Sequence, residues 1–531
     1  MYIFAKIFIR MFFKCLKSKE LCFIVVLFTL LRFVAVLLME LSPQDAYYSY
    51  YSENLALSYF DHPPMVAYMI WFFSLFLGRS EIALHVTNFI VTSGTILFTF
   101  IAFKPFLSKI QSKLLLILLL SAPYITILSI NTTPDIPLLF FWSVSLLLFR
   151  YILFGKGSLT SDNSQLANHK ADWYLWLFVG ISCGFAFDSK YTGIFLPASF
   201  VLFLLLSSEH RKLLFTWKFL LFCFAFLLAI SPVIVWNIQN DFISFKYQSA
   251  DRASDIATFQ FKPKFFIGFF ISQLVIALPI LFLWMYKASF KVFFNWIKSL
   301  FKSKIIDSLS SVELFLACFV APLLFIFSAL SIIYWVKLNW IMPSFLAGSI
   351  LVVIYLTKEG RGISFLRYQT FISLILHVGL LVQLIWMPFK IKSDDTWWGW
   401  DDLADKTEEV KRSTDSHFIF SDNSYKVSAV LNFYLDEHIY GGNVIDNFAF
   451  QFELDNPDLS YLKDKDAVYV LSDRYKKQIL KYTTVEELLS PYFESVKLVD
   501  SLVLFDNDGD EFKRFYFYDC EDYSPEAKQI K

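Results

Sequence analysis

Carboxylates and a histidine lie among aromatic residues in one polar stretch near the N-terminus. The stretch LSPQDAYYSYYSENLALSYFDHPPMVAYM contains Asp45, Glu53, Asp61 and His62. A carboxylate held near a bilayer surface among aromatic rings can have a raised pKa and act as a general base. Aromatic faces also pack against sugar rings and interfacial lipid. The alternative is an ordinary interfacial loop with an aromatic belt, and the spacing alone does not separate the two.

Three more ionisable residues lie where apolar runs begin or turn. Asp135 follows Pro134 in NTTPDIPLLFFW, a position where Asp is also a common helix cap. Asp188 and Lys190 interrupt a hydrophobic hairpin in FDSKYTG. Ionisable residues at such depth are costly and tend to be paired or functional. Lys190 can hold a phosphate as a point charge, pair with Asp188, or extend from a turn to the bilayer surface.

Two later stretches carry amides, indoles and cations at the ends of apolar runs. Side chains of this kind hydrogen-bond sugar hydroxyls and phosphate. The second stretch can equally be an aromatic belt residue beside a lysine that extends to the surface. The stretches SPVIVWNIQNDFISFKYQSADR and YWVKLNWIMP supply Trp236, Asn237, Gln248, Arg252, Lys337, Asn339 and Trp340.

The chain that positions these residues is strongly apolar. Of its 531 residues 56% are hydrophobic, and the mean hydropathy is +0.53. Soluble domains rarely exceed about 50% apolar residues. Runs of roughly 16–23 apolar residues are long enough to cross a bilayer as helices. We therefore predict a mainly α, polytopic transmembrane protein with eleven to thirteen spans, of which eleven are placed at 22–41, 82–103, 114–131, 136–154, 173–187, 191–207, 214–236, 266–286, 313–333, 341–356 and 366–388.

Lysine and arginine residues predict the orientation. With the N-terminus cytoplasmic, twenty-one of them fall in inside segments and seven in outside loops. The apolar stretch 64–78 is short and starts with two prolines, which favours an interfacial or re-entrant helix. The run from Leu21 to Leu41 is too long for a signal peptide and is expected to be a retained span. Every polar cluster described above then lies on the outer side.

The composition changes near residue 391. Residues 1–390 are expected to form the membrane domain, with a catalytic first external loop at about 42–81. Residues 391–531 alternate polar and short apolar runs and are expected to form a small extracytoplasmic α/β domain. The six cysteines indicate neither a disulfide framework nor a metal site, and the net charge of zero implies no nucleic-acid partner.

The outer location of the clusters restricts the chemistry. A transferase that uses a cytosolic nucleotide-sugar would need its site on the other side of the membrane. The sequence also contains no Walker motif and no dinucleotide fingerprint after a strand. The carrier of any activated group is therefore expected to be a lipid.

Several segments resemble one group of membrane enzymes. QDAYYSYYSENLALSYFDHPPMVAYMI resembles the first external loop of bacterial GT-C fold glycosyltransferases, which are similar to protein O-mannosyltransferases and lipid A aminoarabinose transferases. TPDIPLLFFW, SKYTG, SPVIVWNIQNDFISFKYQ and LNWIMPSFL resemble later segments of these proteins in the same order. GWDDLADKTEEV and DAVYVL resemble their extracytoplasmic domain. The resemblance covers almost the whole chain.

The resemblance implies a mechanism. Donors are polyprenyl-phosphate sugars, such as undecaprenyl-phosphate monosaccharides, and transfer inverts the anomeric carbon. An acidic residue of the first external loop activates the acceptor hydroxyl, a role that falls on Asp45. Many relatives have an Asp-Glu pair there, whereas this chain has Gln44-Asp45, which weakens both the assignment of the base and any metal site in that loop. No cofactor is required, although a divalent cation is possible.

The implied function leaves alternatives open. The leading hypothesis is a polyprenyl-phosphate-dependent glycosyltransferase of a bacterial inner membrane that modifies lipid A or another glycolipid. Within the same class, the acceptor can be another glycan or a protein. A transporter, or a non-catalytic protein that binds a lipid-linked sugar, is the alternative from another class. A transporter favours polar groups at the bilayer midplane and repeated halves, whereas here the polar groups lie at the outer boundary.

Overall fold

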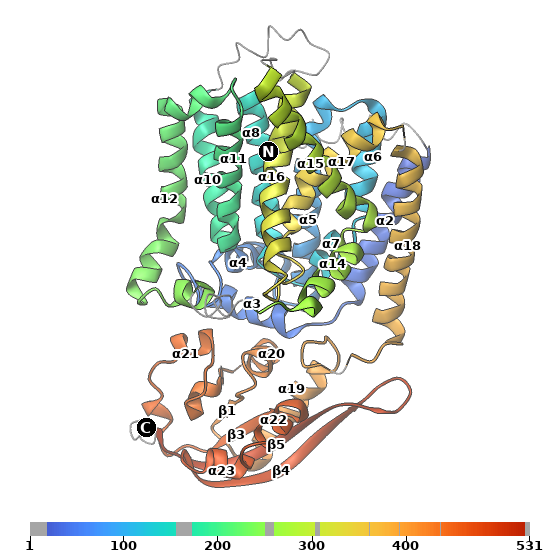
Figure 1. Cartoon of the computed structure of the whole chain (residues 1–531). Helices are drawn as coiled ribbons and strands as arrows, with labels where there is room; N and C mark the ends of the chain where they lie inside the picture. The colour runs from blue at the N-terminus through green and yellow to red at the C-terminus, as the bar shows by residue number, and fades with distance from the viewer. Residues whose placement is uncertain are drawn as a thin grey trace.

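The apolar runs form helices packed side by side in one bundle (Figure 1). The computed structural model describes residues 19–155, 172–249, 260–302, 308–360, 362–391, 393–435 and 437–525. The basic flank before residue 19 and Arg252 lie outside them. The helices of the bundle are α2 (Lys19–Leu38), α3 (Pro43–Glu53), α4 (Met65–Leu77), α5 (Glu81–Phe103), α6 (Lys109–Leu120), α7 (Pro123–Ile130), α8 (Asp135–Phe154), α10 (Trp173–Ser189), α11 (Phe195–Leu206), α12 (Trp217–Gln239), α14 (Pro263–Ile276), α15 (Pro279–Lys302), α16 (Ser308–Leu330), α17 (Met342–Lys358) and α18 (Gly362–Trp386).

The polytopic helical fold is confirmed. Within the described residues six helices are long and apolar enough to cross a membrane, and two bent pairs raise this number to eight at most. Several other helices are short because polar loops replace their outer turns. Thus α10 ends just before Lys190, and α17 begins after the loop that carries Asn339.

The predicted span 266–286 is wrong. The chain turns by 111° between α14 and α15, at Leu278, whose φ of 65° no helix accommodates. Pro279 then starts the next helix, as is common at a first helical position. As a result α14 lies at the end of the bundle and contacts α7 (Figure 1). The stretch 64–78 forms the 13-residue helix α4, which is too short to span, as predicted.

Aromatic residues fill the interior of the bundle. Phe149 of α8 stacks on Phe200 of α11 with ring centroids 3.9 Å apart, and Phe319 of α16 packs on Phe149. Gly180 and Gly184 allow α10 to approach α12 closely, since a Cβ at either position would overlap atoms of α12. This packing holds the ends of α8 and α10 next to each other.

The C-terminal residues form a small mixed sheet with helices, as predicted. The strand order is β2-β1-β3-β5-β4, with β1 parallel to β2 and β3, and β5 antiparallel to β3 and β4. Trp400 is buried against Phe515 of β5. The elements are α19 (Trp400–Thr414), β1 (Phe418–Phe420), α20 (Lys426–Tyr434), β2 (Ile439–Tyr440), α21 (Gln451–Asp455), β3 (Ala467–Ser472), α22 (Asp473–Ile479), α23 (Val485–Leu489), β4 (Phe493–Phe505) and β5 (Glu511–Tyr523).

This sheet unit covers the end of the bundle that carries α3 and α14 (Figure 1). The ring of Tyr425 stacks on Tyr47 of α3, with centroids 4.2 Å apart. The side-chain oxygen of Gln451 accepts a hydrogen bond from the backbone amide of Phe60 at 2.9 Å. The backbone amide of Gln451 donates to the Tyr47 hydroxyl at 3.3 Å. Tyr50 donates to Asp455 at 2.8 Å. The segment 42–81 is therefore held between the bundle and the C-terminal unit.

Candidate active site

A cavity of about 750 Å³ opens at this end of the bundle. Its walls come from α3, the loop before α4, the α7–α8 connection, the turn after α10, α14 and the loop before α17. Apolar residues of α14 and α17 form part of the lining, so the cavity is amphipathic. Its polar lining consists of Gln44, Tyr48, His62, Asn131, Thr133, Asp135, Lys190, Tyr191, Thr192, Gln248, Lys264, Ser272, Lys337, Asn339 and Trp340.

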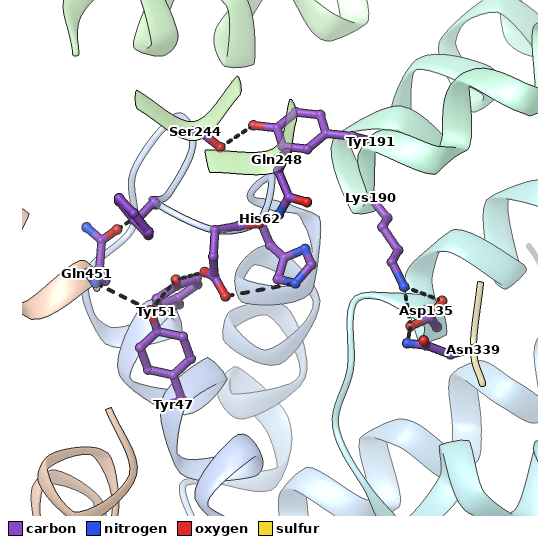
Figure 2. A network of polar contacts seen from close by, with 12 residues as sticks. Tyr47, Tyr51, His62, Asp135, Lys190, Tyr191, Ser244, Gln248, Asn339 and Gln451 are labelled. Carbon is purple, nitrogen blue, oxygen red and sulfur yellow. Dashed lines mark hydrogen bonds and ion pairs between the residues drawn. The ribbon is translucent and has the colours of Figure 1, made fainter. Parts of the chain in front are cut away.

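An ion pair forms one side of the cavity. Lys190 Nζ lies 2.9 Å from both carboxylate oxygens of Asp135, and Asn339 Nδ2 donates to Asp135 at 2.6 Å (Figure 2). Asp135 is 1% exposed and Lys190 7% exposed. The alternative pair of Lys190 with Asp188 is not formed, and Asp135 is not the cap residue of α8, which is Pro134. The pair with Asp135 holds the Lys190 amine at the edge of the cavity.

A glycine places Lys190 at the cavity. The residues after α10 fold back as the short 3₁₀ helix Tyr191–Ile194, in which the Gly193 amide donates to the Lys190 carbonyl at 2.7 Å. A Cβ at Gly193 would lie 2.2 Å from the carbonyl oxygen of Ala186, so only glycine allows this approach. Tyr191 bonds Ser244 at 2.6 Å and ties the turn to the segment after α12 (Figure 2).

The opposite side of the cavity carries an Asp–His pair. His62 lines the cavity, and its Nε2 lies 3.9 Å from Asp61 Oδ2. Asp61 is 9% exposed, accepts a hydrogen bond from Tyr51, and its carbonyl accepts one from Gln248. Burial raises the pKa of Asp61 to about 6, against the opposing effects of the Tyr51 hydrogen bond and the charge of Lys337. Figure 2 shows His62 and Gln248 between the Tyr47–Tyr51 pair and the Asp135–Lys190 pair.

Asp45 lies behind the cavity wall and does not line it. It is 0% exposed and forms a capping box with Ser42 at the start of α3. Ser42 N, Ser42 Oγ and Thr132 N donate to its carboxylate at 3.0, 2.6 and 2.6 Å, and His85 Nε2 lies 3.4 Å away. Burial alone would raise the pKa of Asp45, but His85 and these hydrogen bonds outweigh burial and lower the pKa below its ordinary value. The carboxylate thus joins α3 to the segment that leads into Asp135.

The structure groups most of the predicted residues but not all. The cavity brings together His62, Asp135, Lys190, Gln248, Lys337, Asn339 and Trp340. Asn237 does not line it: Asn237 is fully buried in α12, and its side chain bonds Val233 and Phe245. Trp236 is also buried in α12, away from the lining.

Sequence reasoning missed part of the site. Most of the wall formed by α14 falls inside the predicted span 266–286, and Lys264, just before that span, is not among the predicted site residues. The signal that could have revealed it is the pair of prolines, Pro263 and Pro279, that bracket the apolar run. Gln44 was treated only as a departure from a motif, although its side chain lines the cavity. Within the described residues no three His, Cys, Asp or Glu side chains are grouped as metal ligands.

Comparison with known proteins identifies the architecture. Residues 61–236 match the family described as dolichyl-phosphate-mannose-protein mannosyltransferase. ArnT from Cupriavidus metallidurans bound to undecaprenyl phosphate superposes with a TM-score of 0.63 at 13% identity, over 94% of this chain and 98% of that chain. Its apo structure gives 0.62 at 14% identity, over 94% and 97%. The chain has the GT-C fold. A search of curated proteins finds no significant match.

The cavity opens at the end of the bundle, and all of its lining residues belong to the bundle and its loops. The segment related to the protein O-mannosyltransferases begins at Asp61 and ends at Trp236. It therefore includes His62, Asp135 and Lys190, which provide both sides of the cavity. The resemblance drawn from the sequence is confirmed at the level of the fold and of this relationship.

Proposed function

We propose that this protein transfers a monosaccharide from a polyprenyl phosphate carrier, such as undecaprenyl phosphate, to lipid A or another envelope glycolipid. The observation that carries the proposal is the amphipathic cavity in which the cations Lys190 and Lys337 meet apolar walls at one end of the bundle. A lipid phosphate has two parts that complement this lining: an anionic phosphate that can pair with the lysines and a hydrocarbon chain that can pack on the apolar walls. The match of residues 61–236 and the GT-C fold support the assignment.

The proposed step is a single inverting displacement. The acceptor oxygen forms a bond to the anomeric carbon while the bond from that carbon to the phosphate oxygen breaks. The phosphate oxygen keeps the electron pair and leaves as polyprenyl phosphate, and the acceptor proton passes to a protein base. Lys190 and Lys337 stabilise the charge that develops on the leaving phosphate. Asn339 holds Asp135, which in turn holds Lys190 in place.

We assign the base to the Asp61–His62 pair. A base must come within hydrogen-bond reach of the proton that it removes, and His62 faces the cavity with Asp61 directly behind it. Asp45 also belongs to the first external loop, but both of its oxygens are occupied by groups of the fold. In this proposal Asp45 is a positioning residue that fixes α3 and the approach to Asp135.

The pH dependence tests the role of Asp61. Because its pKa is raised to about 6, the transfer rate of the wild type should fall as the pH drops through about 6. The folded state binds this proton more tightly than the unfolded state, so the contribution of Asp61 to stability increases as the pH falls from about 6 towards 4. In Asp61→Asn both effects should disappear, with transfer reduced about a hundredfold or more. An unchanged pH profile in this variant would contradict the assignment.

The location is part of the proposal. The predicted excess of lysine and arginine on the other side supports a cavity at the periplasmic face of a bacterial inner membrane, with the N-terminus cytoplasmic. The C-terminal unit then lies in the periplasm, where it covers the first external loop. In this proposal membrane lipids surround the bundle, and the lipid-linked donor and the glycolipid acceptor reach the cavity from that side.

A transfer assay separates this function from its alternatives. Purified protein in detergent is mixed with undecaprenyl-phosphate sugars and either lipid A or a serine- and threonine-rich peptide. Formation of a new glycolipid supports the proposal, and formation of a glycopeptide would instead make the protein an O-glycosyltransferase of proteins. Binding of the donor with no product would leave a transporter or a binding protein.

A divalent cation is not part of the proposed step, because lysines neutralise the leaving phosphate. We expect the transfer rate to be the same within a factor of two after treatment with excess EDTA. The rate is measured again after magnesium or manganese is restored, as a control for damage by the chelator. Loss of transfer that either metal restores would add a cation to the site.

A further inference from the structure

A second cavity lies on the other side of the wall that carries His62. It has a volume of about 460 Å³ and includes Phe60 and Tyr247 in its lining. His62, two residues after Phe60, lines the larger cavity, and so does Gln248, one residue after Tyr247. Gln248 donates to the carbonyl of Asp61 and joins the two short segments. The two cavities are therefore separated by a single thin wall.

Four aromatic rings shape the second cavity. Phe60 lies in the middle, with centroids 4.8 Å from Tyr247, 5.1 Å from Phe448 and 5.9 Å from Phe450. Phe448 and Phe450 lie 4.6 Å apart, and Phe448 is 50% exposed. A large aromatic side chain half exposed in a concave site offers a face to a ligand.

The backbone that carries these rings is strained. Phe450 has a φ of 53°, in the left-handed region that a bulky residue rarely adopts. The next residue, Gln451, is tied to the Phe60 amide and to the Tyr47 hydroxyl. Strain of this kind costs roughly 1–3 kcal/mol and persists where the surrounding contacts fix it, often at ligand sites. Here it directs the ring of Phe450 towards Phe60.

Charged groups complete the lining. Lys246 and Glu453 are exposed, one from the segment after α12 and the other from α21. A cation and a carboxylate at the margin of an aromatic cavity pair with hydroxyl and phosphate groups above flat apolar faces. None of the residues that line this cavity belongs to a strand of the sheet, so it offers no strand edge to an extended peptide.

We propose that this second cavity binds the sugar part of the acceptor glycolipid and presents it to the larger cavity across the wall of Asp61 and His62. The inference rests on the proposed function, because it assigns the acceptor side of the same reaction. The apolar face of a sugar ring packs on Phe448 and Phe450, its hydroxyls bond Glu453, and a phosphate on the sugar pairs with Lys246. The acyl chains of the acceptor remain in the membrane.

Binding of a soluble probe tests the site without turnover. The probe is the glucosamine disaccharide of lipid A with both phosphates and without acyl chains, titrated calorimetrically into the full-length protein in detergent. Phe448→Ala should weaken its binding up to about tenfold, the loss of one aromatic contact. Tyr482→Ala, a 91% exposed aromatic that lines neither cavity, is the matched control and should bind as the wild type does. Lys246→Met, a second exposed position, should weaken binding of the bisphosphate but not of the dephosphorylated disaccharide.

The outcomes separate this inference from the proposed function. Undecaprenyl phosphate should bind Phe448→Ala and wild type equally, and in the transfer assay the variant should raise the KM for lipid A about tenfold with kcat nearly unchanged. Equal affinity of wild type and Phe448→Ala for the probe, or no saturable binding by the wild type, overturns the site even if transfer occurs. Probe binding that Phe448→Ala weakens supports the site even if no donor is turned over. Binding of a serine- and threonine-rich peptide that Phe448→Ala removes would overturn the carbohydrate assignment.

Discussion

Replacing Lys190 with methionine should abolish transfer and destabilise the protein. The variant removes the cation that faces the cavity and leaves Asp135 buried with Asn339 as its remaining bonded partner. Removing one partner of a buried ion pair lowers the free energy of unfolding by roughly 3–5 kcal/mol. Loss of one charge that stabilises the leaving group costs on the order of 10²–10³ in rate. Thermal unfolding in detergent and the transfer rate are measured on the same preparation.

A double variant separates the two effects. Lys190→Met combined with Asp135→Asn removes both charges, so most of the lost stability should return while transfer stays absent. Lys212→Met, at an exposed lysine in the 3₁₀ helix before α12, should change neither quantity. Recovery of transfer together with stability in the double variant would show that Lys190 has only a structural role.

Asp45→Asn should lower stability and transfer together. In the wild type the carboxylate accepts from two backbone amides and one hydroxyl, of Ser42 and Thr132, and an asparagine side chain has only one oxygen to accept them. Its NH₂ group then faces a buried donor that has lost its acceptor, which costs roughly 1–3 kcal/mol of folding free energy. The first turn of α3 and the segment before Asp135 should loosen, and with them the cavity wall that they support.

The matched control is Glu53→Gln, on the same helix. Glu53 pairs with Arg79 at 3.0 Å, and both side chains are more than a third exposed, so the change should cost less than about 1 kcal/mol. If Asp45→Asn unfolds at the wild-type temperature and binds undecaprenyl phosphate normally, yet transfers no sugar, then Asp45 is the base and the Asp61–His62 assignment is wrong.

Much of the fold could be predicted from the sequence, because a long apolar run in the local composition indicates a membrane helix. The short helix predicted at 64–78 is α4, and the predicted C-terminal sheet unit follows the last helix of the bundle. The span 266–286 was misplaced because hydropathy does not record a turn in the backbone. The reversal at Leu278 requires a positive φ, which the apolar sequence around this residue does not indicate.

The roles of individual site residues were harder to predict, because partners distant in the chain decide them. The sequence left open whether Lys190 holds a phosphate, pairs with Asp188 or extends to the bilayer surface, and its partner in the structure is Asp135, 55 positions earlier. Asp45 follows an N-cap serine by three residues, and this local capping signal was overlooked in favour of a catalytic role. His85 lies in an apolar helix, where nothing local indicates contact with Asp45.

Single-turnover transfer tests the central claim most directly. Purified protein in excess is mixed with undecaprenyl phosphate carrying a radiolabelled sugar and with lipid A, and the lipids are separated at intervals. The account predicts that label moves into a new glycolipid in the wild type, with an equal amount of undecaprenyl phosphate released, and that Lys190→Met shows neither. Donor that stays intact while bound to the wild-type protein, with every acceptor offered, would contradict it.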